Sequence, residues 1–145
     1  ASGKILSGFH ILRALALGAD MCNSARAMMM ALGCIQALEC NKNSCPTGVA
    51  TQDPTLVKGL VIEDKKHRVA NFHKHTMEGF VELMASAGID HPSGLNRHQI
   101  SRRVFMNKVA TLEEIYPSIP VGSMLGSEMP ERYKMSYASA SAEKF

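Results

Sequence analysis

The amino-acid sequence predicts an α/β protein, and three observations lead to this fold class. Over residues 1–35 a loop, a helix, a short apolar segment and a second helix follow one another, an order typical of α/β folds. One strand and two helices cannot form such a sheet, so we expect the partner strands to come from elsewhere. The chain has 145 residues, whereas a complete (β/α)8 barrel needs about 250.

The first part of the chain predicts two helices around a short strand. Residues 1–6 form a loop, Ser7 is a candidate N-cap, and apolar residues at helical spacing continue to Gly18, a candidate C-terminal glycine. Residues 19–22 predict a short buried strand. A cap at Asn23-Ser24 and apolar positions from 25 to 35 then predict a second helix, and residues 40–54 predict a loop.

The second part predicts further helices and then an irregular tail. Apolar residues three and four apart predict a long amphipathic helix over 63–87, ended by Gly88. A turn follows at 90–94, and a short helix is expected around 96–100. Thr111 and Glu114 have the spacing of a capping box. Beyond Pro117, a segment rich in Ser, Gly and Pro predicts an irregular or disordered tail.

Composition excludes several classes of function. The net charge of +3 is small and evenly spread, Trp is absent, and aromatic residues make up 6%, so we expect no nucleic-acid partner. No apolar run reaches about 18 residues, so we expect no membrane partner. No signal-peptide layout is visible, which predicts a cytoplasmic protein. Because the chain starts with Ala rather than Met, we expect a piece of a longer protein.

A group of cysteines carries the strongest chemical signal. Cys34, Cys40 and Cys45 lie within one short stretch, and Pro46 follows the last. Cytosolic proteins rarely use such a group for disulfides, so thiolate ligation of an iron–sulfur cluster or of zinc is favoured. Three thiolates suit a three-iron cluster, whereas zinc needs a fourth ligand, for which Cys22 and His67 are candidates. Ordinary cysteines without a metal remain the third interpretation.

These cysteines stand in a longer motif. The run Leu-Gly-Cys ending at Cys34, and the stretch 40–54 with its Cys-Pro-Thr-Gly-Val-Ala-Thr-Gln-Asp-Pro, resemble the cluster segment of the FMN-binding domain of glutamate synthases. Residues 2–20 are similar to the seventh-to-eighth βα stretch of that domain's barrel. Asp-His-Pro at 90–92 and Arg-Arg-Val-Phe-Met at 102–106 resemble stand-alone bacterial glutamate-synthase-like proteins.

The resemblance implies the C-terminal part of a (β/α)8 TIM barrel with a helical extension. It divides the chain into the last βα units and cluster loop at 1–54, a helical extension at 55–117 and a tail at 118–145. It implies FMN and a 3Fe-4S cluster as cofactors, with Cys34, Cys40 and Cys45 as the metal ligands. Electrons would pass through the cluster to the flavin, which would reduce 2-iminoglutarate, formed from 2-oxoglutarate and ammonia, to glutamate.

The same resemblance implies a phosphate-binding site for FMN. In flavin barrels the phosphate lies on the loops after strands 7 and 8, near a helix N-terminus. Here these loops contain Gly3 on one side and Ser24, Ala25 and Arg26 on the other. Relatives commonly carry a small residue at the position of Arg26. Without the resemblance, Ser24 would be a plain N-cap and Arg26 a plain surface charge.

Other functions and partners stay open at this point. A structural zinc module used for docking is one alternative, and a flavoprotein relative that acts on another amino acid, such as N-methylglutamate, is a second. The implied partners are the rest of the barrel and an electron donor, either ferredoxin or a pyridine-nucleotide subunit. No catalytic residue is assigned, because the implied substrate site lies on earlier strands, and we expect the isolated chain to be inactive.

Overall fold

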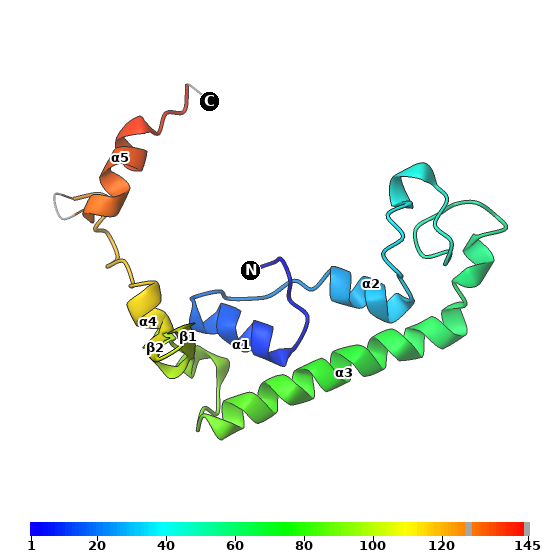
Figure 1. Ribbon diagram of the computed structural model, residues 1–145, viewed down its shortest axis with the longest axis horizontal. Coiled ribbons are helices and arrows are strands. Elements are labelled where there is room, and N and C mark those ends of the chain that lie inside the picture. The colour runs from blue at the N-terminus through cyan, green and yellow to red at the C-terminus, as the bar shows by residue number, and fades with distance from the viewer. Residues whose placement is uncertain (127–128, 144–145) are drawn as a thin grey trace.

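The protein is built along one long helix. The computed structural model describes residues 1–126 and 129–143. Its α-helices are α1 (Gly8–Ala16), α2 (Arg26–Leu32), α3 (Ile62–Ser86), α4 (Leu112–Ile115) and α5 (Glu131–Ser139). The strands β1 (Ser101–Phe105) and β2 (Lys108–Thr111) and the 3-10 turns η1 (Cys40–Lys42), η2 (Val57–Gly59), η3 (Pro92–Gly94) and η4 (Arg97–Gln99) complete it. In Figure 1, α1 and α2 lie along α3, and α5 lies apart from them.

Helix α1 confirms the first predicted helix and its boundaries. Ser7 is the extended N-cap residue, and Gly18 has the left-handed conformation expected after the helix, with φ of 104°. The Ser7 hydroxyl hydrogen-bonds to Nδ1 of His10 at 3.0 Å and not to a helix N–H group. The helix therefore ends where the sequence predicts, although its cap differs in detail.

Helices α1 and α3 touch through their backbones. A Cβ atom placed on Gly8 would lie 2.4 Å from the backbone nitrogen of Phe80 and 2.8 Å from the carbonyl carbon of Gly79. Only a residue without a side chain allows this crossing. Around it lies the core, whose buried members are Leu12, Ala16, Phe80, Met84, Ile89, Ile100 and Leu112.

The predicted strand at residues 19–22 is wrong. This segment contains no strand, and Met21 is 69% exposed. Its backbone makes one rung of pairing: the amino group of Ala1 donates to the Met21 carbonyl at 2.5 Å, and the Asn23 N–H donates to the Ala1 carbonyl at 2.8 Å. This is the pattern of parallel strands, but a single rung does not make a ladder.

The second predicted helix forms as α2 but is shorter than expected. It ends at Leu32, because Gly33 adopts the left-handed conformation with φ of 110°, and Ile35 lies outside it. The predicted cap at Ser24 is also wrong. Ala25 is the residue before the helix, and the Ser24 hydroxyl donates instead to the carbonyl of Ile5 at 2.7 Å.

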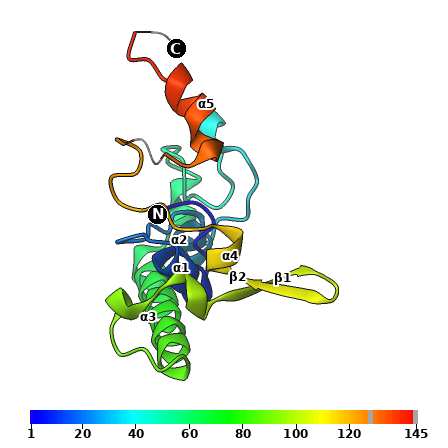
Figure 2. The same cartoon turned by 90° about the vertical axis from the view of Figure 1, so that its left-hand side faces the viewer.

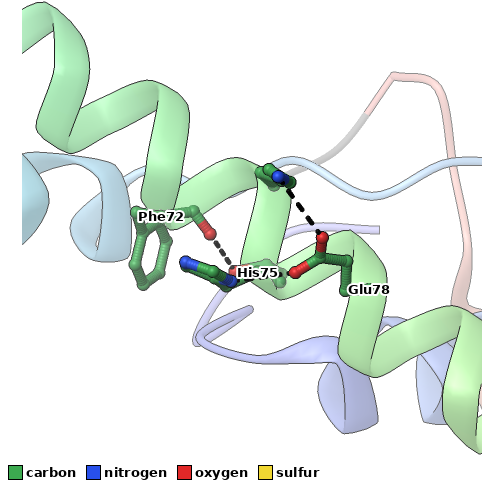
Figure 3. A network of polar contacts seen from close by, with 5 residues as sticks. Phe72, His75 and Glu78 are labelled. Carbon is green, nitrogen blue, oxygen red and sulfur yellow. Dashed lines mark hydrogen bonds and ion pairs between the residues drawn. The ribbon is translucent and has the colours of Figure 1, made fainter.

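Helix α3 confirms the long predicted helix. Its helical hydrogen bonds extend to the N–H of Ala87, which donates to the Leu83 carbonyl. Gly88 follows with φ of 71°. The exposed face carries local pairs: Nδ1 of His75 lies 2.8 Å and Nζ of Lys74 lies 3.8 Å from the carboxylate of Glu78 (Figure 3). The Thr76 hydroxyl donates to the Phe72 carbonyl at 2.7 Å (Figure 3). These pairs keep the solvent-facing side of α3 polar.

A β-hairpin was not expected from the sequence. Strands β1 and β2 pair antiparallel, with Ser101 opposite Thr111 and a bulge between Arg103 and Phe105. The hairpin projects from the helices (Figure 2). It is the only sheet within residues 1–126 and 129–143, so the barrel stays a prediction.

The C-terminal part is more helical than predicted. The short helix expected around 96–100 is present as η4, and the capping box of Thr111 and Glu114 begins α4. The tail, however, contains α5, so the expectation of an irregular segment is wrong over residues 131–139. Its end at residues 144–145 lies outside the described residues. No helix in the described part of the chain is long and apolar enough to cross a membrane.

The helix crossing leads to a testable prediction. Substitution Gly8→Ala forces α1 and α3 apart and should lower the free energy of unfolding by about 1–3 kcal/mol, as overpacking does in other cores. Gly79→Ala is the matched control, since a Cβ there meets nothing within 4 Å, and should stabilise the helix by up to about 1 kcal/mol. Urea unfolding of both variants measures this. Equal effects of the two substitutions would contradict the crossing.

Candidate functional site

The cysteine segment begins where α2 ends. The N–H of Gly33 donates to the Met30 carbonyl, and the N–H of Cys34 donates to the Met29 carbonyl at 3.0 Å. This C-terminal motif turns the chain sharply, so Cys34 leaves the helix at its end. The Cys34 sulfur accepts a hydrogen bond from the backbone N–H of Gln36 at 3.4 Å.

The middle of the loop is held by an acidic side chain. The Glu39 carboxylate accepts from Nζ of Lys42 at 3.2 Å and from the Ser44 hydroxyl at 2.9 Å. Cys40 starts η1 beside it and is exposed. The charge of Lys42 is therefore already matched by an anion within the loop.

Asn43 joins the two halves of the loop. It adopts a left-handed conformation with φ of 60°, which Asn tolerates. Its side-chain oxygen accepts from the backbone N–H of Gln52 at 2.6 Å, and its carbonyl accepts from the Thr51 hydroxyl at 2.6 Å. The next turn is fixed by Asp53, whose carboxylate accepts from the hydroxyl of Thr55 at 2.5 Å and from its N–H at 2.8 Å. These two hydrogen bonds lower the pKa of Asp53.

Cys45 lies in the most polar environment of the cysteines. The thiol is buried, and its sulfur lies 3.4 Å from the Thr47 hydroxyl. This hydroxyl, followed by the backbone N–H groups of Ala50, Thr47 and Val49, lowers the pKa of Cys45 to about 7. The thiolate, which is the metal-binding form, is therefore readily available near neutral pH.

Two glycines pack the loop against the residues that follow it. A Cβ on Gly48 would lie 2.4 Å from the Leu56 carbonyl oxygen, and one on Gly59 would lie 2.8 Å from the Thr47 carbonyl oxygen. Gly48 also has φ of 75°. The turn after Cys45 thus rests directly on the backbone around η2.

The structure brings together two of the three predicted metal ligands. Cys34 and Cys40 line one cavity of about 420 Å³, whose other lining residues are Arg26, Met29, Met30, Gln36 and Leu38. Cys45 is not part of this lining. Within residues 1–126 and 129–143, no three His, Cys, Asp or Glu side chains gather as they would around one metal ion.

The donor set fits a cluster better than a single ion. Zinc needs four ligands within about 2.3 Å of one point, and neither Cys22 nor His67 is found in such a group in the described residues. A cluster is several ångströms across, so its ligands stand further apart. Three thiols of one loop, two on one cavity and one prone to ionise, are the type of donor that iron–sulfur clusters use.

The predicted phosphate residues also lie on adjoining segments. Gly3 has φ of 87°, and the residues on either side of its loop are tied to the second segment, Ala1 to Asn23 and Ile5 to Ser24. Within the described ranges, no hydrogen bond uses the backbone N–H of Gly3 or Ala25. These N–H groups can therefore receive an anion. Arg26 is different, since it lines the cavity of Cys34 and Cys40.

Several residues that build the site were not predicted. Asn43, Thr47, Gly48 and Gly59 act through hydrogen bonds or close backbone contact. A glycine two residues after a Cys-Pro pair is a signal for a tight turn. The hydroxyl of Thr47 gives no such signal, because its role depends on how the turn folds.

Comparison with known proteins points to one family over most of the chain. The family described as a conserved region in glutamate synthase matches residues 1–90. The chain is 50% identical over 103 residues to the glutamate synthase large subunit-like protein YerD of Bacillus subtilis, a match that covers 71% of this chain and 20% of that protein.

Two further relatives extend the comparison. The archaeal glutamate synthase [NADPH] of Methanocaldococcus jannaschii is 42% identical over 90 residues, which are 62% of this chain and 18% of that protein. The glutamate synthase [NADH] of Saccharomyces cerevisiae is 28% identical over 134 residues, which are 90% of this chain and 6% of that protein. The chain thus spans a fifth or less of the length of these relatives. No solved structure matches it.

The environment of Cys45 predicts a pH dependence. In metal-free, reduced protein, alkylation of Cys45 by iodoacetamide should accelerate as the pH rises through about 7, because the thiolate is the reactive form. Thr47→Val removes the strongest cause of the lowered pKa and should move this midpoint to higher pH. Mass spectrometry of the labelled peptide measures both. A midpoint unchanged by Thr47→Val would show that the hydroxyl has no such role.

The glycine contact in the loop predicts a selective loss of stability. Gly48→Ala combines a left-handed backbone with a collision against the Leu56 carbonyl. Gly18→Ala is the control, because φ is also positive there but a Cβ meets nothing within 4 Å. We expect Gly18→Ala to cost about 1–2 kcal/mol and Gly48→Ala about 1–3 kcal/mol more. Urea unfolding and proteolysis of the loop are the measurements, and identical losses would argue against the contact.

Proposed function

Because the chain belongs to the glutamate synthase family, we propose that it carries the iron–sulfur loop and part of the flavin-phosphate site of an FMN- and 3Fe-4S-dependent oxidoreductase. The proposed reaction is the reduction of 2-iminoglutarate, formed from 2-oxoglutarate and ammonia, to glutamate. The cysteine loop after α2 is the observation that carries the proposal. When bound, the cluster and the flavin would supply the electron transfer that this reduction needs.

The loop supports Cys34, Cys40 and Cys45 as cluster ligands. Cys34 and Cys40 share one cavity, and the Cys45 thiol ionises readily. Asn43 and Gly48 hold the loop through its own backbone. Such a loop can keep its shape while the sulfurs exchange protons for iron.

The residues around Gly3 support a flavin-phosphate site. The N–H groups of Gly3 and Ala25, which make no hydrogen bond within the described residues, are donors of the kind that bind phosphate. The proposed fold around this site is a TIM barrel, as the family resemblance implies. In that barrel the chain would supply the last βα units, and the remaining strands would complete the flavin and substrate sites.

The proposal extends to partners and location. The names of the relatives mention NADPH and NADH, which favours electrons that come from a pyridine nucleotide, directly or through a partner subunit. Ferredoxin is the alternative donor. A cytoplasmic location stays a prediction from the sequence. The docking module with structural zinc is the alternative function, and it predicts bound zinc without sulfide.

The proposed ligands lead to a direct test. In the full-length protein, purified without oxygen, Cys34→Ser, Cys40→Ser and Cys45→Ser should each abolish most of the bound iron and acid-labile sulfide. Cys22→Ser is the matched control, since Cys22 lines a separate cavity with Met28 and Phe72, and should keep both. Wild-type protein with zinc in place of iron and sulfide would overturn the proposal.

A further inference from the structure

Arg26 occupies an unusual position for a phosphate ligand. It is the first residue of α2, next to the predicted phosphate loop, but it is one of the residues that line the cavity of Cys34 and Cys40. The other walls of this cavity are mostly apolar, with Met29, Met30 and Leu38. Arg26 is exposed, so water screens part of its charge.

Arg26 has no carboxylate partner among the described residues, and neither has Lys58 of η2. Lys42 pairs with Glu39 at 3.2 Å, and Lys65, whose ammonium lies close to Gly33, pairs with Asp64 at 3.5 Å. Among the described residues, Arg26 takes part in no ion pair and its side chain makes no hydrogen bond. Its charge is thus uncompensated where two of the proposed ligands meet.

We propose that Arg26 is a positioning residue for electron transfer, which raises the reduction potential of the proposed cluster through its charge. A cluster held by three thiolates is an anion, and uptake of one electron makes it more negative by one charge. A cation beside Cys34 and Cys40 stabilises the reduced form more than the oxidised form. This inference rests on the proposed function and assigns Arg26 to the cluster rather than to the phosphate of FMN.

The test is a redox titration of the full-length protein, followed by the EPR signal of the oxidised three-iron cluster. Arg26→Gln should lower the midpoint potential, and Arg26→Lys, which keeps the charge, should restore most of the wild-type value. The FMN content and the Kd for FMN should be unchanged in Arg26→Gln. This second readout separates the cluster role from a phosphate role.

Two controls separate local charge from other effects. The double variant Glu63→Gln/Lys66→Gln removes a matched pair from the start of α3 and leaves the net charge unchanged, so the potential should stay near wild type. Arg102→Gln removes one positive charge from β1, which lies at the far end of α3 from the cysteine loop (Figure 1), and should also have little effect.

Each of the remaining outcomes would contradict one of the claims made above. If iron is bound and Arg26→Gln leaves the potential unchanged, the inference is wrong and the proposed function stands. If Arg26→Gln loses FMN without a change in potential, Arg26 binds the phosphate. If Arg102→Gln shifts the potential as much as Arg26→Gln does, the effect is one of net charge. If wild-type protein binds neither iron nor sulfide, both proposals fail together.

Discussion

The backbone contact between α1 and α3 is the constraint around which the protein is arranged. Gly8 lies against Gly79 and Phe80 so closely that no side chain can stand between them. Leu12 of α1 and Met84 of α3 both belong to the core that lies around this contact. Because α2 also packs along α3, the same helix carries the cysteine loop at its other end (Figure 1). The site therefore depends on a crossing that contains no functional residue.

The sequence predicted those elements whose signals are local. α1, α3 and the capping box of Thr111 were identified because helical periodicity and caps are written in neighbouring residues. The strand at 19–22 was wrong because a strand exists only with a partner, and here Ala1 supplies one rung. The β1–β2 hairpin was missed because its apolar and basic residues are largely exposed and do not alternate clearly.

The sequence predicted which residue types form the site but not how they are arranged. The spacing of Cys34, Cys40 and Cys45 indicated metal chemistry, but the different surroundings of the three sulfurs depend on how the loop folds. The assignment of Arg26 shows the same limit. Its place in the sequence beside Ala25 suggested the phosphate, and the structure also places it among the residues that line the cavity of Cys34 and Cys40. Adjacent residues of a helix point in different directions, so they can serve different groups.

Helix α3 is long and runs well beyond its contact with α1. From the crossing at Phe80 to the first residue, Ile62, a helix of this kind extends about 27 Å. A tilt of only ~2° about the crossing would move that end by about 1 Å, as a lever does. The cysteine loop is joined to this end through η2 and Gly59. Small rearrangements in the packing of α1 are thus magnified at the loop, where electron transfer would be sensitive to ångström-scale displacements.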